Sequence, residues 1–140
     1  MSKLIVKSHL GNYELHDKKI SRSFFLRAKK KTLYLIDKNV YYKNKTINKL
    51  KKNIILIKSN ENSKSYHKIA HIIKSILKKE IKRDYEICSI GGGIVQDISG
   101  FVSSILFRGI NWVYIPTTIL SQCDSCIGGK TSINFAKYKN

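Results

Sequence analysis

The chain has 140 residues, 42% of them apolar, which is enough for one domain with a buried core, and no apolar stretch approaches the roughly 20 residues that cross a bilayer. Its formal charge of +18 comes from lysines scattered along the chain without regularly interleaved aromatic residues, so neither a nucleic acid nor a membrane is expected as a partner. The N-terminal apolar run Leu4-Ile5-Val6 is too short for a secretory signal, and we expect a cytoplasmic protein.

The first predicted elements are strands. Residues 1–30 carry a weaker pattern than the rest, and an antiparallel hairpin within residues 9–27 is one interpretation of them. The first continuous apolar run, residues 33–36, predicts a buried strand that ends at Asp37. A second run, residues 53–57, predicts another strand.

Helices alternate with strands in the second half of the chain. Isoleucine and leucine recur at helical spacing between residues 65 and 81, which predicts a helix there. A third strand is predicted at residues 85–90 and a second helix at residues 94–107, which closes at Gly109. A fourth strand is predicted at residues 111–115, just before Pro116.

This alternation predicts an α/β fold. Strands that are nearly continuous apolar runs belong to a parallel sheet that is covered on both faces. We therefore predict one Rossmann-like α/β domain over residues 1–140, with a mostly parallel sheet and helices on both of its faces.

The third strand delivers Gly91-Gly92-Gly93 to the start of a helix, with Asp97 one turn later. Glycine lets a pyrophosphate approach the backbone, where the free N–H groups of the first helical turn point at it. The pattern is not the G-x-G-x-x-G fingerprint, and a glycine turn also permits close packing of a strand on a helix. Both interpretations stay open at this point.

The segment after the fourth strand concentrates hydroxyl groups, a carboxylate, glycines and a lysine between residues 116 and 131. Ligands of open α/β sheets sit at the carboxyl ends of parallel strands, which is where this segment begins. It is therefore the second candidate site.

These segments together resemble the signature of 3-dehydroquinate synthases. The matching motifs are Gly91-Gly92-Gly93-x-x-x-Asp97-x-x-Gly100-Phe101, Arg108-Gly109, Pro116-Thr117-Thr118-x-Leu120-x-Gln122-x-Asp124-Ser125-x-x-Gly128-Gly129-Lys130-Thr131 and Lys139-Asn140. Upstream, the segments 37–40 and 61–65 resemble the first and second nucleotide-contact loops of that family. The resemblance covers roughly residues 33 to 140.

The resemblance implies a sugar-phosphate cyclase of the shikimate route to aromatic amino acids, a lyase that uses NAD catalytically. Such enzymes convert 3-deoxy-D-arabino-heptulosonate 7-phosphate into 3-dehydroquinate and phosphate. A divalent metal, zinc or cobalt, acts as a Lewis acid. A phosphorylated sugar-acid substrate and a homodimer are the implied partners.

Site residues follow from the resemblance, position by position. The implied cofactor-binding residues are Asp37, Asn39, Ser59, Asn60, Glu61, Asn62, Ser63, Lys64, Gly92, Gly93, Ile94, Val95, Gln96, Asp97, Thr117, Thr118, Leu120, Asp124, Lys130 and Lys139. The implied catalytic residues are Arg108, Asp124, Lys130, Lys139 and Asn140, with Arg108 contributing to the phosphate pocket, either directly or across a dimer interface.

Two departures from the family pattern stand out. Gln96 replaces the usual glycine, so we expect a more crowded helix N-terminus and a weaker grip on the pyrophosphate. The family's metal ligands lie in a helical second domain, downstream of the part that matches Lys139-Asn140. No metal ligand is therefore expected within these 140 residues, and we expect them to be inactive alone.

Weaker patterns are interpreted as structural. His67 and His71 stand four apart on a predicted helix but have no third ligand nearby. The spacing of Cys123 and Cys126 is that of a redox pair, yet it falls inside the matched loop, and the three cysteines suggest no disulfide framework. Alternatives to a synthase are another sugar-phosphate cyclase, a glycerol-dehydrogenase-like protein, a non-catalytic NAD-binding remnant, or a basic protein that binds nucleic acid.

Overall fold

The computed structural model describes residues 3–7, 11–17, 24–25, 31–51, 53–127 and 131–139. Its elements along the chain are β1 (Lys3–Val6), β2 (Tyr13–His16), β3 (Thr32–Asp37), α2 (Lys38–Lys43), the 3₁₀ turn η1 (Ile47–Lys49), β4 (Ile54–Ile57), the 3₁₀ turn η2 (Glu61–Lys64), α3 (Tyr66–Leu77), β5 (Glu86–Gly91), α4 (Gly93–Ile105), η3 (Leu106–Arg108), β6 (Trp112–Pro116) and the π-helix η4 (Ser121–Ser125). None of the described helices is long and apolar enough to cross a membrane.

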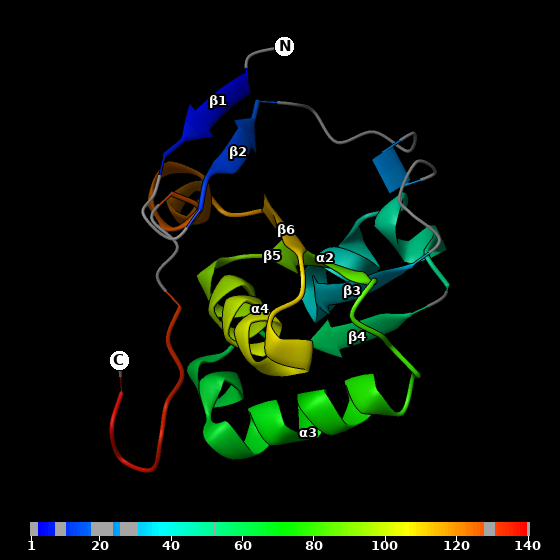
Figure 1. The fold of residues 1–140 in the computed structure, drawn as a ribbon, viewed down its shortest axis with the longest axis vertical. Coiled ribbons are helices and arrows are strands. Elements are labelled where there is room, and N and C mark those ends of the chain that lie inside the picture. Colours follow the sequence, from blue (N-terminus) through cyan, green and yellow to red (C-terminus); the bar gives the residue numbers. More distant parts are fainter. Residues whose placement is uncertain are drawn as a thin grey trace.

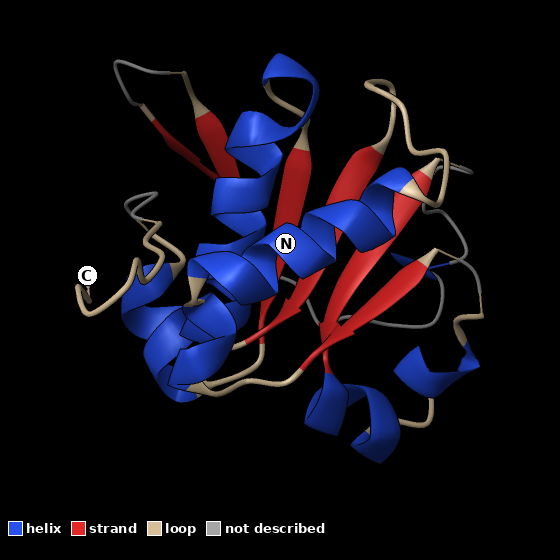
Figure 2. Cartoon of the chain, turned by 90° about the horizontal axis from the view of Figure 1, so that it is seen from below, coloured by secondary structure: helices blue, strands red, loops and turns tan. Residues whose placement is uncertain are grey.

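The centre of the fold is a four-stranded sheet in the order β4-β3-β5-β6, and every pairing in it is parallel (Figures 1 and 2). All six residues of β3 are buried. A parallel sheet with both faces covered explains why its strands are continuous apolar runs. The predicted α/β fold and the four predicted sheet strands are confirmed, with boundaries shifted by at most one residue.

One face of the sheet is covered by the two long helices α3 and α4, which cross in front of the strands in Figure 2. Ile69 and Ile76 of α3 and Val95 and Ile98 of α4 are at most 1% exposed and form one core with sheet residues such as Leu33. The apolar stripe that predicted the first helix is therefore the stripe that meets the sheet.

The opposite face has a thinner cover. Tyr34, Ile36 and Ile90 form a second apolar cluster there, closed by residues of α2 and η1 and by Phe24 and Phe25. Burial raises the pKa of Tyr34 to about 12. Helix α2 is absent from the predicted elements because six residues show less than two turns of periodicity.

Strands β1 and β2 form a separate antiparallel pair, with Lys3 opposite His16. The pair begins before the predicted range of 9–27, and much of the rest of that range lies outside the described residues.

At the C-terminal end of α4, Gly109 has a φ of 102° and directly follows η3. This is the position after a helix where a glycine was predicted.

Candidate functional site

The carboxyl ends of the sheet strands meet at one edge of the molecule. Gly91 at the end of β5 pairs with Pro116 at the end of β6, and Asp37 at the end of β3 pairs with Ile57 at the end of β4. The backbone N–H of Thr117 donates to the Gly91 carbonyl at 2.9 Å, which joins the two loops directly. The two candidate segments of the sequence are therefore neighbours in space.

Asp37 is buried and holds the start of α2. Its Oδ1 accepts hydrogen bonds from the backbone N–H groups of Asn39 at 2.7 Å and Val40 at 3.3 Å, as an N-cap residue does. Next to it, Asn39 and Thr117 line an open cavity of about 540 Å³. The other lining residues are mostly apolar, and they are Phe25, Val40, Lys43, Asn44, Thr46, Ile47, Ile90, Ile115 and Pro116.

The three glycines at the start of α4 serve two purposes. A Cβ on Gly91 would lie 2.6 Å from the Cγ2 of Val95, so this glycine permits close packing of strand on helix. A Cβ on Gly93 would meet its nearest heavy atom, the Ser125 Oγ, at 3.9 Å. Packing therefore explains Gly91 and does not explain Gly93.

The N-terminus of α4 has N–H groups free of side-chain acceptors. Its N-cap is Gly92, which offers no side chain, whereas α2 and η2 are capped by the side chains of Asp37 and Asn60. Residues 92–94 are partly exposed, so a ligand can reach these groups. An accessible turn of N–H groups that no described side chain caps, on a 13-residue helix, fits an anionic ligand such as a pyrophosphate.

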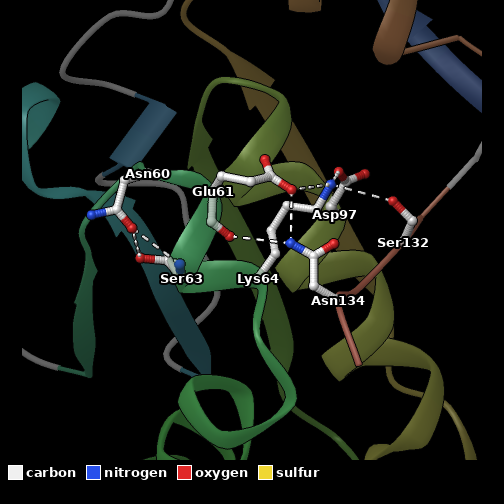
Figure 3. Close-up of polar contacts among 7 residues, drawn as sticks. All are labelled: Asn60, Glu61, Ser63, Lys64, Asp97, Ser132 and Asn134. Carbon is white, nitrogen blue, oxygen red and sulfur yellow. Dashed lines mark hydrogen bonds and ion pairs between the residues drawn. The ribbon is translucent and has the colours of Figure 1, made fainter. Parts of the chain in front are cut away.

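Lys64 forms the centre of a polar network beside that turn (Figure 3). Its side chain is 8% exposed, and its Nζ lies 2.9 Å from Asp97 Oδ2 on α4 and 3.7 Å from Glu61 Oε1. The same Nζ donates to Ser132 Oγ at 3.3 Å. A buried ammonium needs such partners, because leaving water is costly for a charge.

Asn134 ties the C-terminal segment to this network. Its Nδ2 donates to Glu61 Oε1 at 2.8 Å, and its backbone bonds to Lys64 and Tyr66 on either side of Ser65. Neither Ser132 nor Asn134 was among the predicted site residues. Their partners lie 68 and 73 positions away, and the sole signal in the sequence was their place between the matched Thr131 and Lys139.

Asn134→Ala should reduce the dependence of stability on acidic pH. The Asn134 amide, followed by Lys64 and Lys139, lowers the pKa of Glu61 below its ordinary 4.5. A lowered folded-state pKa stabilises the fold above the unfolded value, and this contribution is lost as the pH falls through the folded value. We expect the effect to be small, since Glu61 is half exposed.

The measurement is urea unfolding of Asn134→Ala and the parent between pH 3 and pH 7, with Asn62→Ala on the exposed surface of the same turn as control. The difference in free energy of unfolding between the two ends of this range should shrink in Asn134→Ala and stay unchanged in Asn62→Ala. Equal pH profiles for all three proteins would show that Asn134 does not hold the Glu61 carboxylate.

Beyond β6 the chain enters the π-helix η4. The Thr118 and Ser121 hydroxyl oxygens lie 2.8 Å apart, and the Ser121 N–H donates to the Thr118 Oγ1 at 3.2 Å, so Thr118 holds the first residue of this helix. Asp124 is exposed on η4, and Leu120 is exposed just before it. Short π-helices are rare, and they are frequent at functional sites.

Several predicted site residues stand apart from this edge. Arg108 follows the far end of α4, which at 1.5 Å per residue lies roughly 20 Å from the glycine turn, so one chain does not bring it to the edge. The Val95 side chain is 0% exposed in the core, which leaves only its backbone to face a ligand. Lys130 and Asn140 lie outside the described residues.

Gln96 was expected to crowd the N-terminus of α4, and the weaker grip on a pyrophosphate stays a prediction. The Gln96 side chain is 2% exposed and donates through Nε2 to the backbone carbonyl of Ser125, on η4. It is turned toward η4, so it occupies the interface between the two helices.

The histidine pair, His67 and His71, is exposed on α3, and the described residues hold no group of three side chains suited to a metal ion.

A parallel sheet whose carboxyl edge carries an open glycine turn and a buried lysine–carboxylate network defines an open α/β protein of the class that binds ligands at that edge. Residues 53–140 match the family model described as "3-dehydroquinate synthase N-terminal". The chain belongs to that family.

Known relatives agree with this membership. A 3-dehydroquinate synthase of Alkaliphilus oremlandii is 43% identical over 116 residues, which cover 79% of this chain and 32% of the relative. A structure of 2-epi-5-epi-valiolone synthase from Streptomyces hygroscopicus with NAD⁺ and Zn²⁺ bound is 25% identical, with a TM-score of 0.70 over 79% of this chain and 33% of that one. The chain spans about a third of the length of the curated relatives it matches.

A third comparison supports the fold alone. The structure of 2-deoxy-scyllo-inosose synthase complexed with carbaglucose-6-phosphate, NAD⁺ and Co²⁺ is 19% identical, with a TM-score of 0.81. The match covers 99% of this chain and 42% of that one. Nearly the whole described fold, including the region before β3, therefore has a counterpart in a sugar-phosphate cyclase.

Proposed function

We propose that this chain is the NAD-binding part of a 3-dehydroquinate synthase, the enzyme that converts 3-deoxy-D-arabino-heptulosonate 7-phosphate to 3-dehydroquinate and phosphate. The observation that carries the proposal is the accessible N-terminus of α4, where Gly92 leaves the first-turn N–H groups without a side-chain acceptor. Membership of the family and the names of its curated relatives support the choice of this reaction over that of another cyclase.

The adenosine end of NAD occupies the side of the edge formed by β3 and β4 in this proposal. Next to this side, the cavity lined by α2, η1 and the ends of β5 and β6 has apolar walls suited to a flat ring and polar groups such as Asn39. The carboxylates of Asp37 and Glu61 accept hydrogen bonds from hydroxyl or amino groups of the nucleoside. Ser59, Asn60, Asn62 and Ser63 shape the turn that carries Glu61 and Lys64, and Ser63 donates its backbone N–H to Asn60 Oδ1 at 3.0 Å.

The pyrophosphate lies on the backbone of residues 92–95, with the positive end of the α4 dipole beneath it. Asp97, one turn later, accepts a hydrogen bond from a ribose hydroxyl, while Lys64 holds its carboxylate in place. Thr117, Thr118 and Leu120 line the opposite side of the cleft, on the loop after β6.

The nicotinamide and substrate end falls between η4 and the C-terminal segment. Asp124 is exposed on η4, and Lys130 and Lys139 supply positive charge for a substrate that carries a carboxylate and a phosphate. Asn140 completes this group, and Arg108 reaches the phosphate of a neighbouring subunit in a homodimer. When bound, NAD supplies reversible hydride acceptance from a substrate hydroxyl, and a divalent metal, held by residues outside this chain, supplies Lewis-acid polarisation.

The experiment is an assay of the complete gene product with the heptulosonate phosphate, NAD and Zn²⁺ or Co²⁺, followed by release of phosphate and formation of 3-dehydroquinate. Omission of NAD should abolish turnover. Binding of NAD without turnover would instead support a non-catalytic remnant, and turnover of a different sugar phosphate would support another cyclase.

Asp97→Asn should weaken NAD binding roughly ten- to a hundredfold, because a hydrogen bond to a charged group contributes about 1.5–3 kcal/mol. Isothermal titration of the complete protein with NAD measures this. Asp84→Asn is the matched control, since Asp84 is an exposed acid that pairs with Lys31 before the amino end of β5. Equal affinities in both variants would contradict the placement of the ribose on α4.

The proposal includes a homodimeric state and a cytoplasmic location, both supported by the family resemblance. Light scattering on the eluting peak of a gel filtration column measures the mass of the complete protein and so tests the first.

A further inference from the structure

We propose that Gln96 is a positioning residue that fastens the Asp124-bearing π-helix η4 to the N-terminal turn of α4; the proposal rests on the proposed function for the role of Asp124. The glutamine is an unusual choice for its place. A side chain with two polar ends is 98% buried on a helix that otherwise faces the core with Val95, Ile98 and Val102. Burial of an amide costs free energy unless its hydrogen bonds are made.

One end of the carboxamide makes such a bond. Its Nε2 donates to the backbone carbonyl of Ser125, the last residue of η4. Carbonyl groups in the last turn of a helix find no N–H donor within the helix, so they need a donor from outside it. Gln96 therefore caps the C-terminal end of η4 with its side chain, although it lies 29 residues earlier in the sequence.

The other end fixes the orientation of the amide. The Gln96 Oε1 is buried and has no hydrogen-bond partner among the residues that the structure describes. Rotation of the amide by half a turn would place this oxygen against the Ser125 carbonyl, and two acceptors would then oppose each other. The protein thus tolerates one unsatisfied oxygen in order to keep the donor on Ser125.

The position of the bond gives it a functional consequence. Ser125 directly follows Asp124, and the Ser125 Oγ lies 3.9 Å from where a Cβ of Gly93 would be, so η4 sits over the glycine turn. The end of η4 is closed by backbone bonds, such as that from the Cys126 N–H to the Ser121 carbonyl at 3.0 Å, and the Gln96 bond adds an anchor on α4. A cap on its last residue therefore fixes the distance between Asp124 and the nucleotide-binding turn.

The test compares Gln96→Met, which keeps the length of the side chain and loses the donor, with Gln96→Ala, which loses both. Ser104→Ala on the exposed surface of α4 is the control. Amide hydrogen exchange of peptides covering residues 121–127 is measured in the complete protein without nucleotide. We expect roughly tenfold faster exchange in both glutamine variants, as the loss of one buried hydrogen bond predicts, and no change in the control.

Three outcomes would overturn the proposal that Gln96 positions Asp124 by fastening η4. If Gln96→Met exchanges at the parental rate, the glutamine merely fills space. If exchange rises equally in core peptides of β3 and β5, Gln96 supports the whole fold and not η4 in particular. If exchange rises selectively but kcat is unchanged, η4 is fastened without consequence for Asp124.

The kinetic arm separates the tether from the proposed function. In the complete enzyme, Gln96→Met should lower kcat about tenfold and change the Kd for NAD less than about twofold, because the pyrophosphate binds backbone groups that the amide does not touch. A parental protein that neither binds NAD nor turns over substrate would refute the proposed function, and the exchange result would still decide whether Gln96 fastens η4.

Discussion

Lys64→Met should lower the free energy of unfolding by about 3 kcal/mol, the cost of breaking a buried ion pair. The Lys64 side chain is 8% exposed and Asp97 is 22% exposed, so removal of the ammonium leaves a carboxylate that water only partly reaches. It also removes the donor to Ser132 and one link between η2 and α4. Urea denaturation monitored by circular dichroism measures the loss as a shift of the midpoint at constant slope.

Lys68→Met is the matched control for this loss. Lys68 is exposed on α3, one turn after Lys64, and its replacement should stay within about 0.5 kcal/mol of the parent. A second comparison, Lys64→Met combined with Asp97→Leu, should recover part of the lost stability, because no uncompensated charge then remains on α4. Equal losses in the single and double variants would show that the ion pair does not carry the effect.

Gly91→Ala should destabilise the protein by about 2 kcal/mol, which is typical for overpacking a dense core. The new Cβ would lie 2.6 Å from the Cγ2 and 2.7 Å from the Cβ of Val95, and Val95 is fully buried. Relief requires movement of α4 away from the end of β5. Thermal unfolding of the purified variant measures the loss.

Gly93→Ala separates packing from backbone flexibility in the same turn. Its Cβ would be 3.9 Å from the nearest heavy atom, so stability should be unchanged or slightly increased by the better helix propensity of alanine. If Gly91→Ala and Gly93→Ala destabilise equally, the whole turn depends on glycine for its backbone, and the contact with Val95 is not the cause.

Periodicity was sufficient to predict the sheet strands and the two long helices. A strand that is buried on both faces needs apolar side chains on both, which makes it a continuous apolar run, as in β3. A helix that packs on the sheet with one face shows a single apolar stripe, as in α3. The strand order β4-β3-β5-β6 was not predicted, because the apolar runs do not specify which strands pair.

The sequence identified the short segments of the candidate site, and it gave no sign of the contacts between distant residues. The glycine turn and Asp37 are signals within a few residues, and the structure places them at the same edge, where Asp37 also caps a helix that was not predicted. The contact of Asn134 with Glu61 spans 73 positions, and the bond of Gln96 to Ser125 spans 29 positions. No local sequence pattern predicts contacts between residues so far apart. Arg108 came from resemblance alone, and within one chain it lies at the wrong end of α4.

The bare N-cap of α4 also has a thermodynamic meaning. A serine or aspartate in place of Gly92 would add only about a few tenths of a kcal/mol at an ordinary helix start, because glycine is itself a tolerated N-cap residue. The hydrogen-bonding capacity of the first turn is available to an anion that binds the folded chain and not the unfolded one. Such a ligand contributes stability in proportion to the logarithm of its concentration above the Kd. Under the proposed function, the thermal resistance of this protein would rise with the supply of its nucleotide.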